Sequence, residues 1–312
     1  MTDVKHQTSP QAVQTTGHAW DGDLQEFNNP LPRWWLWSFY ATVVFSIIYW
    51  FIYPSWPIGE DFLKGFKSVA YTSGEQVEVT AWNTRAMLMD DLKNSTAAQR
   101  QQEYMQRVTD TSYEEIVQDP EMLAFVRSVG KGLFGDNCAA CHGRGGQGVM
   151  GMYPNLADDG WLWGGTMESI EQTLHLGRNG FMPAFGEVLD DAQLDDVAEY
   201  VLFLSGEAPL TEAVQRGGGI FQGMEGGCYY CHNRTGKGLE SQGAANLTDQ
   251  IWTIAPVPAQ STLEGKKAAL KQFISNGVAI NQRVMPAWNQ RLSPTEIKVL
   301  SVYVHQLGGG QQ

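Results

Sequence analysis

The stretch Cys138-Ala139-Ala140-Cys141-His142 has a counterpart 90 residues later, Cys228-Tyr229-Tyr230-Cys231-His232. These two runs contain all four cysteines of the 312-residue chain. Two cysteines that are separated by two residues and followed directly by histidine form the attachment motif of c-type haem. The thiols reach the two vinyl groups of the haem, and the imidazole becomes an axial ligand of the iron. The sequence therefore predicts two covalently bound haem c groups.

Other uses of paired cysteines fit this pattern less well. A four-cysteine zinc site is disfavoured because the two pairs lie much further apart in sequence than in zinc ribbons. A thioredoxin-like redox pair would need a βαβ context, which the sequence does not suggest. A structural disulfide is compatible with an oxidising compartment, but it would not require a histidine after both pairs. Haem attachment is the interpretation that uses all three residues of each motif.

The similarity between the two halves extends beyond the cysteines. Asn155-Leu156 follows the first motif, and Asn246-Leu247 follows the second at nearly the same distance. The segments Met182-Pro183-Ala184-Phe185 and Met285-Pro286-Ala287-Trp288 come next. An internal similarity of this kind indicates a duplicated unit, and each repeat has the size of an ordinary domain.

Each repeat begins and ends with the signals of a helix. Asp119 can cap the first helix of the first repeat, and the two closing helices are predicted to start near Asp190 and Ser293. Neither repeat shows a convincing alternating pattern of a β-strand. The predicted fold class is therefore all-α, with one N-terminal transmembrane helix followed by two tandem cytochrome c domains, residues 116–207 and 208–312.

Methionine is the predicted second ligand of each iron. Met182 and Met285 are both followed by proline, which would fix the loop that carries the thioether. Ligation by histidine and methionine gives a closed, six-coordinate iron that is suited to electron transfer. We expect each methionine to serve the haem of its own repeat, although a swap across the domain interface would leave the sequence pattern unchanged. His175 is an alternative ligand for the first iron.

Arginine and tryptophan side chains near the motifs are candidates for the surroundings of the haems. Arg178 and Arg283 are candidate partners of the haem propionates, because a guanidinium group matches the shape of a carboxylate. A solvated surface position explains either arginine nearly as well. Trp161, Trp163 and Trp252 follow the two Asn-Leu pairs and are predicted to form walls of the haem pockets.

Residues Trp34–Tyr53 read WWLWSFYATVVFSIIYWFIY, a run of 20 residues without a charge. A helix of that length crosses a hydrocarbon core of about 30 Å, and aromatic residues at both ends suit the membrane interfaces. A long polar segment precedes the run, which argues against a cleaved signal peptide. We predict a single transmembrane helix over residues 34–54.

The basic residues near this helix do not decide its orientation. Covalent haem attachment takes place on the outer face of bacterial membranes, so we expect the haem domains to be periplasmic and residues 1–33 to be a cytoplasmic tail. Residues 55–115 are predicted to form a helical linker. The formal net charge of −13 argues against nucleic acid as a partner and favours a basic soluble one.

The segment Asn29-Pro30-Leu31-Pro32-Arg33-Trp34-Trp35, the aromatic-rich span and the two repeats together resemble the CcoP (FixP) subunit of cbb3-type cytochrome c oxidases. The resemblance covers nearly the whole chain. It implies an electron-transfer subunit of a proton-pumping terminal oxidase in the bacterial inner membrane, with no catalytic residues of its own. It also implies that electrons pass from a soluble or membrane-bound donor cytochrome c, through the monohaem cytochrome c subunit, to the catalytic haem–copper subunit.

Two other classes of protein share parts of the pattern. A dihaem peroxidase would need one iron open to peroxide, and the methionine segment in both repeats argues against that. The cytochrome subunit of a membrane dehydrogenase would share the haems and the anchor and would differ only in its partner. Co-purification distinguishes this second class from an oxidase subunit.

Overall fold

The structure of the protein is a computed structural model that describes residues 14–73 and 76–309. The chain divides into two compact units, Met1–Gln99 and Arg100–Gln312. Helices dominate the described residues, but the expected all-α class is incomplete. Four two-stranded antiparallel ribbons are also present in the part of the chain that the structure describes.

The first unit contains the predicted apolar helix. The described part of this unit begins with the ribbon of β1 (Thr15–Trp20) and β2 (Leu24–Phe27), and α1 (Arg33–Ile52) follows. Pro32 precedes this helix and Pro54 follows it, as the sequence predicts. None of its 20 residues is buried, which a core helix of a soluble protein would not show. Among the described residues, α1 is the one candidate membrane-spanning helix by length and composition.

The segment after α1 differs from the expected helical linker. The described residues of 57–73 and 76–81 include the strands of two ribbons, and helices follow only after them. The strands are β3 (Pro57–Ile58), β4 (Asp61–Phe62), β5 (Ser68–Ser73) and β6 (Gln76–Ala81), and the helices are α2 (Thr84–Asn94) and α3 (Thr96–Asp110). In β6, Val77 and Val79 alternate with polar residues, which is the period-two pattern of a strand with β-branched residues.

The second unit carries both cysteine motifs. Its helices are α4 (Tyr113–Gln118), α5 (Pro120–Asn137), α6 (Ala139–His142), α7 (Met167–Leu176), α8 (Asp191–Leu204), α9 (Glu212–Gln222), α10 (Tyr229–His232), α11 (Leu263–Asn276) and α12 (Pro294–His305). Asp119 caps α5, and capping boxes start α8 at Asp190 and α12 at Ser293. The predicted starts of these three helices are therefore confirmed.

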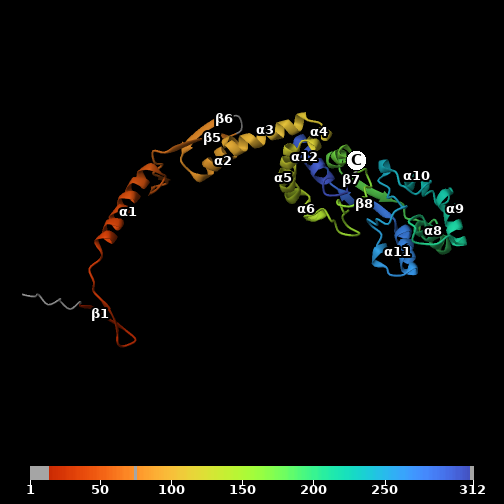
Figure 1. Ribbon diagram of the computed structural model, residues 1–312, viewed down its shortest axis with the longest axis horizontal. Helices are drawn as coiled ribbons and strands as arrows, with labels where there is room; N and C mark the ends of the chain where they lie inside the picture. Colours follow the sequence, from red (N-terminus) through yellow and green to blue (C-terminus); the bar gives the residue numbers. More distant parts are fainter. Residues whose placement is uncertain (1–13, 74–75, 310–312) are drawn as a thin grey trace, which may run out of the picture. The chain divides into compact units, whose positions relative to one another are not determined.

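The helices of the two repeats do not pack as the sequence order suggests. Helix α8, which closes the first repeat, packs against α9 and α11 of the second repeat. Helix α12, which closes the second repeat, packs against α5 and α7 of the first (Figure 1). We call α5, α6, α7 and α12 the first haem domain, and α8, α9, α10 and α11 the second haem domain.

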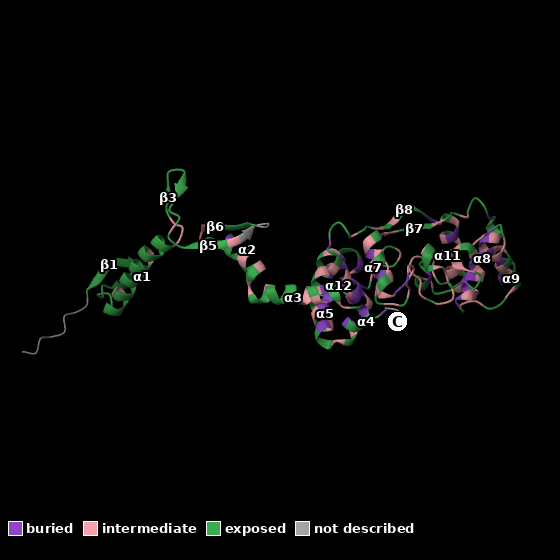
Figure 2. Cartoon of the chain, turned by 90° about the horizontal axis from the view of Figure 1, so that it is seen from above, coloured by how far each residue is buried: buried purple, intermediate pink, exposed green. Residues whose placement is uncertain are grey.

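Each haem domain has its own apolar core. Phe134, Ile297 and Leu300 are central in the first haem domain, and Leu202 and Val257 in the second. Figure 2 shows buried residues along α12 and α5 and along α8 and α11. Such cores are the main source of stabilisation, because apolar burial is worth about 25 cal/mol per Å².

A ribbon of two strands carries the chain from one haem domain to the other. Strand β7 (Arg178–Met182) pairs with β8 (Val278–Met285), and Arg178 lies opposite Met285. Asn179 and Asn281 bind each other twice, since their side-chain amides are 2.8 Å apart and the Asn281 N–H donates to Asn179 Oδ1 at 3.0 Å. The two strands come from different repeats, so the exchange of helices takes place at this ribbon.

Candidate haem sites

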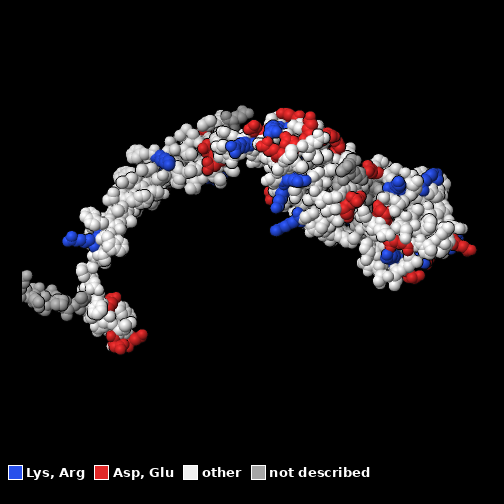
Figure 3. All heavy atoms as spheres, viewed as in Figure 1, with Lys and Arg blue, Asp and Glu red and all other residues white. Residues whose placement is uncertain are grey.

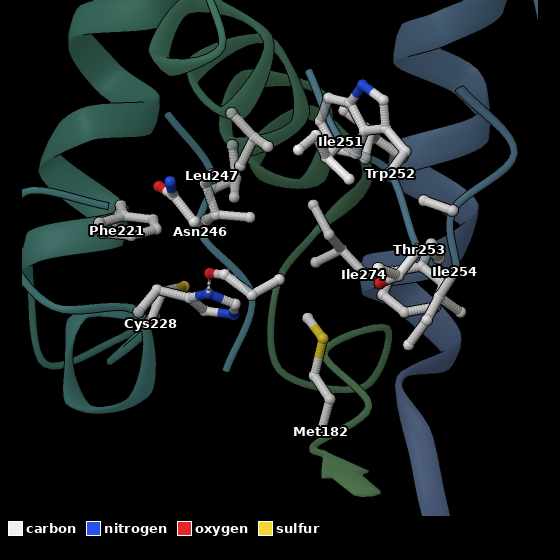
Figure 4. A pocket seen from close by; sticks show the side chains of 17 residues that line it. Met182, Phe221, Cys228, Asn246, Leu247, Ile251, Trp252, Thr253, Ile254 and Ile274 are labelled. Atoms are coloured by element: carbon white, nitrogen blue, oxygen red, sulfur yellow. Dashed lines mark hydrogen bonds between the residues drawn. The ribbon is translucent and has the colours of Figure 1, made fainter. Parts of the chain in front are cut away.

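The second cysteine motif lies in an apolar pocket. Cofactor pockets in proteins are typically lined by apolar side chains with a few polar groups. Cys228 and His232 are on one wall, and Figure 4 shows Met182 pointing into the pocket from the opposite side. Apolar side chains make up most of the remaining lining, including Phe221, Leu247, Ile251, Trp252, Ile254, Leu270, Phe273 and Ile274.

Both histidines are oriented by a backbone carbonyl. His232 Nδ1 lies 2.9 Å from the carbonyl oxygen of Ala245, and His142 Nδ1 lies 3.1 Å from that of Pro154. A carbonyl oxygen can only accept, so Nδ1 carries the proton and Nε2 presents its lone pair. Burial lowers the pKa of both imidazoles, which keeps them neutral. A neutral imidazole with a free Nε2 is the form that binds iron.

Each cysteine motif is wound into a short helical turn. The His142 N–H donates to the carbonyl of Cys138 at 3.0 Å, and the His232 N–H donates to that of Cys228 at 2.9 Å. The turn brings the histidine and the first thiol of each motif to one side of the chain. Burial raises the pKa of the Cys138 and Cys228 thiols to about 11. All four cysteines, including the exposed Cys141, are free thiols in the structure.

The two methionine segments are exchanged between the haem domains. Met182, from the first repeat, lines the pocket of His232. Met285, from the second repeat, packs against the core cluster that includes Cys138. The expectation that each methionine lies beside the motif of its own repeat is therefore not met.

Backbone hydrogen bonds hold this exchange in the same way on both sides. The N–H of Phe185, three residues after Met182, donates to the carbonyl of Ile274 on α11 at 3.2 Å. The N–H of Trp288, three residues after Met285, donates to the carbonyl of Leu174 on α7 at 2.8 Å. The two segments are thus each fixed to the helix of the other repeat.

Two glycines allow the methionine segments to lie directly against the ends of α7 and α11. Gly177 and Gly277 follow α7 and α11 at φ +68° and +60°, a region that favours glycine. A Cβ on Gly177 would overlap the carbonyl oxygen of Met285, and a Cβ on Gly277 would overlap that of Met182. The sequence interpretation missed both residues, although a glycine at the end of each middle helix is a visible signal.

The other predicted residues have partners within the protein. Arg178 donates to Thr173 Oγ1 at 2.9 Å, and Arg283 donates to the carbonyl oxygens of Gly151 and Met152. Their role toward haem propionates stays a prediction. His175 is half-buried, with its Nε2 3.9 Å from the carboxylate of Glu171, and its role as an alternative ligand is untested. Trp161 packs in the first haem domain, Trp252 lines the pocket of His232, and the ring of Trp163 lies 4.7 Å from the guanidinium carbon of Arg178.

The residues present fit a haem group in chemistry as well as in shape. Each site offers two thiols at the attachment spacing and a neutral imidazole with a free Nε2. The second site also has an apolar pocket with a thioether pointing into it, and the first has Met285 packed beside Cys138. These are the axial and covalent partners of a low-spin haem c. The fold and sites thus define a c-type cytochrome with one candidate membrane anchor.

Comparisons with known proteins agree with this class. Residues 12–60 match the model of the N-terminal domain of cytochrome oxidase-cbb3, FixP. Residues 127–201 and 212–304 match that of cytochrome c oxidase, cbb3-type, subunit III.

Relatives that align over nearly the whole chain are also named as subunits of cbb3-type cytochrome c oxidases. The chain is 45% identical to the cbb3-type cytochrome c oxidase subunit FixP of Azorhizobium caulinodans, covering 95% of this chain and 94% of the relative. It is 42% identical to the FixP subunit of a Bradyrhizobium species over the whole of both chains. It is 37% identical to subunit CcoP of Azospirillum brasilense, covering 98% and 99%. The chain belongs to the FixP/CcoP family of cytochrome subunits of cbb3-type oxidases.

Proposed function

We propose that the chain holds two haem c groups with crossed axial ligands. Cys138, Cys141 and His142 would hold the first haem, with Met285 as the second axial ligand. Cys228, Cys231 and His232 would hold the second haem, with Met182 as its partner. The observation that carries this proposal is the position of Met182 in the pocket of His232.

The bound haems would supply one-electron chemistry, and the protein would keep it to electron transfer. With a histidine and a methionine bound to each iron, no position would stay open for oxygen or peroxide. The carbonyls of Pro154 and Ala245 hold each imidazole in one tautomer and orientation. On its own the chain is therefore not an enzyme but an electron carrier, and a dihaem peroxidase is the less favoured alternative.

We infer that the carrier works between a donor cytochrome c and the oxygen-reducing part of the oxidase. Electrons would pass through the monohaem cytochrome c subunit to the catalytic haem–copper subunit. Helix α1 would hold the chain in the bacterial inner membrane as a single span, with residues 1–33 cytoplasmic and the haem domains periplasmic. Residues 1–13 of that tail lie outside the described residues.

An acidic surface would favour a basic donor. Figure 3 shows acidic side chains over the part of the second unit where α3 and α4 lie, and Asp110, Glu114, Glu115 and Glu121 are exposed there. Charge attraction of this kind reaches about 8 Å at physiological ionic strength. Oxidation of a basic donor by the complex should therefore slow as salt is added, and a rate indifferent to salt would refute the steering.

Haem content and complex composition test the proposed function. The purified protein should retain two haems on a denaturing gel after acid–acetone extraction, and its mass should exceed that of the chain by two haem groups. It should co-purify with the haem–copper subunit. One haem, or haem that is extracted by acid–acetone, would contradict the cofactor assignment. Co-purification with a dehydrogenase would favour that alternative.

A further inference from the structure

The two haem domains touch through the loops that border their haem sites. The half-buried ring of Trp163 lies directly against the backbone of Gly243, where a Cβ would overlap the ring. Gly243 is two residues before Ala245, whose carbonyl orients His232. The loop that fixes the second histidine is therefore in contact with Trp163.

The repeat also relates Trp163 to the first haem site. It lies eight residues after Asn155, just as Ile254 lies eight residues after Asn246. Ile254 lines the second haem pocket, so the repeat assigns Trp163 to the corresponding wall of the first.

The indole also contacts the ribbon. The guanidinium carbon of Arg178 lies 4.7 Å from the centre of a Trp163 ring. Arg178 pairs in the ribbon with Met285, the proposed ligand of the first iron. The Trp163 ring thus contacts the histidine loop of the second haem site and also Arg178, which pairs across the ribbon with the proposed ligand of the first iron.

On the opposite side of the interface, Ile254 has the repeat position that Trp163 has in the first repeat. There the N–H of Gly151 lies 3.4 Å from the carbonyl of Thr253, beside Ile254. An aliphatic residue therefore stands where the first repeat has tryptophan. We call Trp163 the aromatic bridge, because its ring connects the Gly243 loop of the second haem site to Arg178 of the ribbon.

We propose that Trp163 is a positioning residue for electron exchange between the two haems. This inference rests on the proposed function, because it needs both haems to be present. In the step, one iron goes from ferrous to ferric while the other goes from ferric to ferrous. No proton or leaving group is involved, and Trp163 ends unchanged. The ring would keep the two sites in continuous contact, which an empty gap or a solvent layer would interrupt.

The test measures the relaxation between the haems after flash photoreduction of the full-length, haem-loaded protein. Trp163→Leu should slow this relaxation several-fold, and Trp163→Phe should retain most of the rate because it keeps an aromatic ring. The two midpoint potentials, the haem content and the unfolding temperature should stay close to those of the unchanged protein. An unchanged relaxation rate in Trp163→Leu would overturn the inference.

A glycine pair supplies a matched control. Gly243→Ala should also slow the relaxation, because the new methyl group must push the ring away. Gly206 has a similar backbone (φ +77°) with nothing within 4 Å of a built Cβ, so Gly206→Ala should leave the relaxation rate unchanged. Equal rates in both alanine variants would contradict the bridge. Shifted potentials or lost haem in Trp163→Leu would show that the ring is needed for the structure of a haem site, and would likewise overturn the inference.

The outcomes separate this inference from the proposed function. Absence of a second haem from the unchanged protein would refute the proposed function itself. If the protein holds two haems with histidine and methionine ligands, but the relaxation between them is unchanged in Trp163→Leu, only the proposed role of Trp163 is refuted.

Discussion

The two haem domains share the exchange of segments but are reinforced differently. In the first haem domain, α12 buries Val299 and Val302 against Val108 and Ile116 of α3 and α4, so an additional apolar core supports it. In the second haem domain, ion pairs join α11 to α8 and to Glu207, three residues after the end of α8. These are Lys266 with Glu207, Lys267 with Glu199 at 3.6 Å, and Lys271 with Asp191 and Asp195 at 2.8 and 3.2 Å.

This difference separates what the repeat determines from what each domain adds. The methionine segment, the glycine after the middle helix and the exchanged closing helix occur in both domains. They are therefore properties of the duplicated unit. The additional apolar core occurs only in the first haem domain among the described residues, and the ion pairs of α11 only in the second. They therefore add to the stability of one domain but do not determine the exchange of segments.

Division of the chain between the repeats should have the largest effect. A fragment of residues 100–207 keeps α5 and α7 but lacks α12, so Phe134 and Val126 lose their cover. We expect it to lose cooperative unfolding and the near-infrared methionine–iron band, whereas a fragment of residues 100–309 keeps both haems. Both fragments are exported with a cleavable signal and compared by absorption and thermal unfolding. A folded 100–207 fragment with an intact band would contradict the exchange.

The start of the fragment matters for this experiment. Val108 is completely buried in the core that supports α12. A soluble fragment should therefore begin near Arg100, because one that begins at Ser112 would leave a cavity and lose part of this core.

Alanine at the two close-approach glycines should have the next largest effect, and it should act on the opposite haem. Gly177→Ala should weaken the bond of Met285 to the first iron, and Gly277→Ala that of Met182 to the second. An alanine in this extended backbone conformation with positive φ costs about 1–3 kcal/mol, and the overlap with the methionine carbonyl adds to it. The readout is the methionine–iron band and the potential of each haem. Gly206→Ala also places an alanine at positive φ but without the overlap, and an equal effect there would argue against a role in ligation.

Removal of an ion pair should have the smallest effect, confined to the second haem domain. Hydrogen bonds that Lys271 donates to Asp191 and then to Asp195 raise its pKa above the ordinary value. Because the folded-state pKa is the higher one, the stabilisation is complete below about pH 10.4, the unfolded value. It is lost as the pH rises through the folded value.

Salt offers the simplest measurement of this effect. Lys271→Ala should lower the unfolding temperature of the second haem domain slightly at pH 7 and low salt, and not at high salt or above the folded pKa. A deficit that persists at high salt would assign the effect to packing of the lysine side chain instead.

The sequence could predict those parts of the structure that depend on residues close to one another in the chain. The caps at Asp119, Asp190 and Ser293 are recognisable because they depend on a few neighbouring residues. The apolar helix is recognisable from length and composition alone. The motif cysteines and histidines meet in short turns for the same reason.

The pairing of the repeats could not be predicted from local signals. The two closing helices have similar apolar patterns, so either could cover α5, and the methionine spacing is the same for crossed and uncrossed ligation. Strand β7 has the sequence RNGFM, which lacks β-branched residues, so no strand was predicted there. Strand β8 extends over eight residues, about 26 Å at 3.3 Å per residue. That reach makes the exchange possible, but it is visible only once the strand is known.

The crossed ligands are tested most directly by proton NMR of the reduced, haem-loaded protein. In that state an iron-bound methionine methyl group is shifted far upfield by the haem ring current. The signal that disappears in Met182→Leu identifies Met182. It should show cross-relaxation to Leu247 and Ile274, which line the pocket of His232. The signal that disappears in Met285→Leu should show contacts with Leu174 of the first haem domain. The opposite result, with Met182 beside Leu174 and Met285 beside Ile274, would contradict the account.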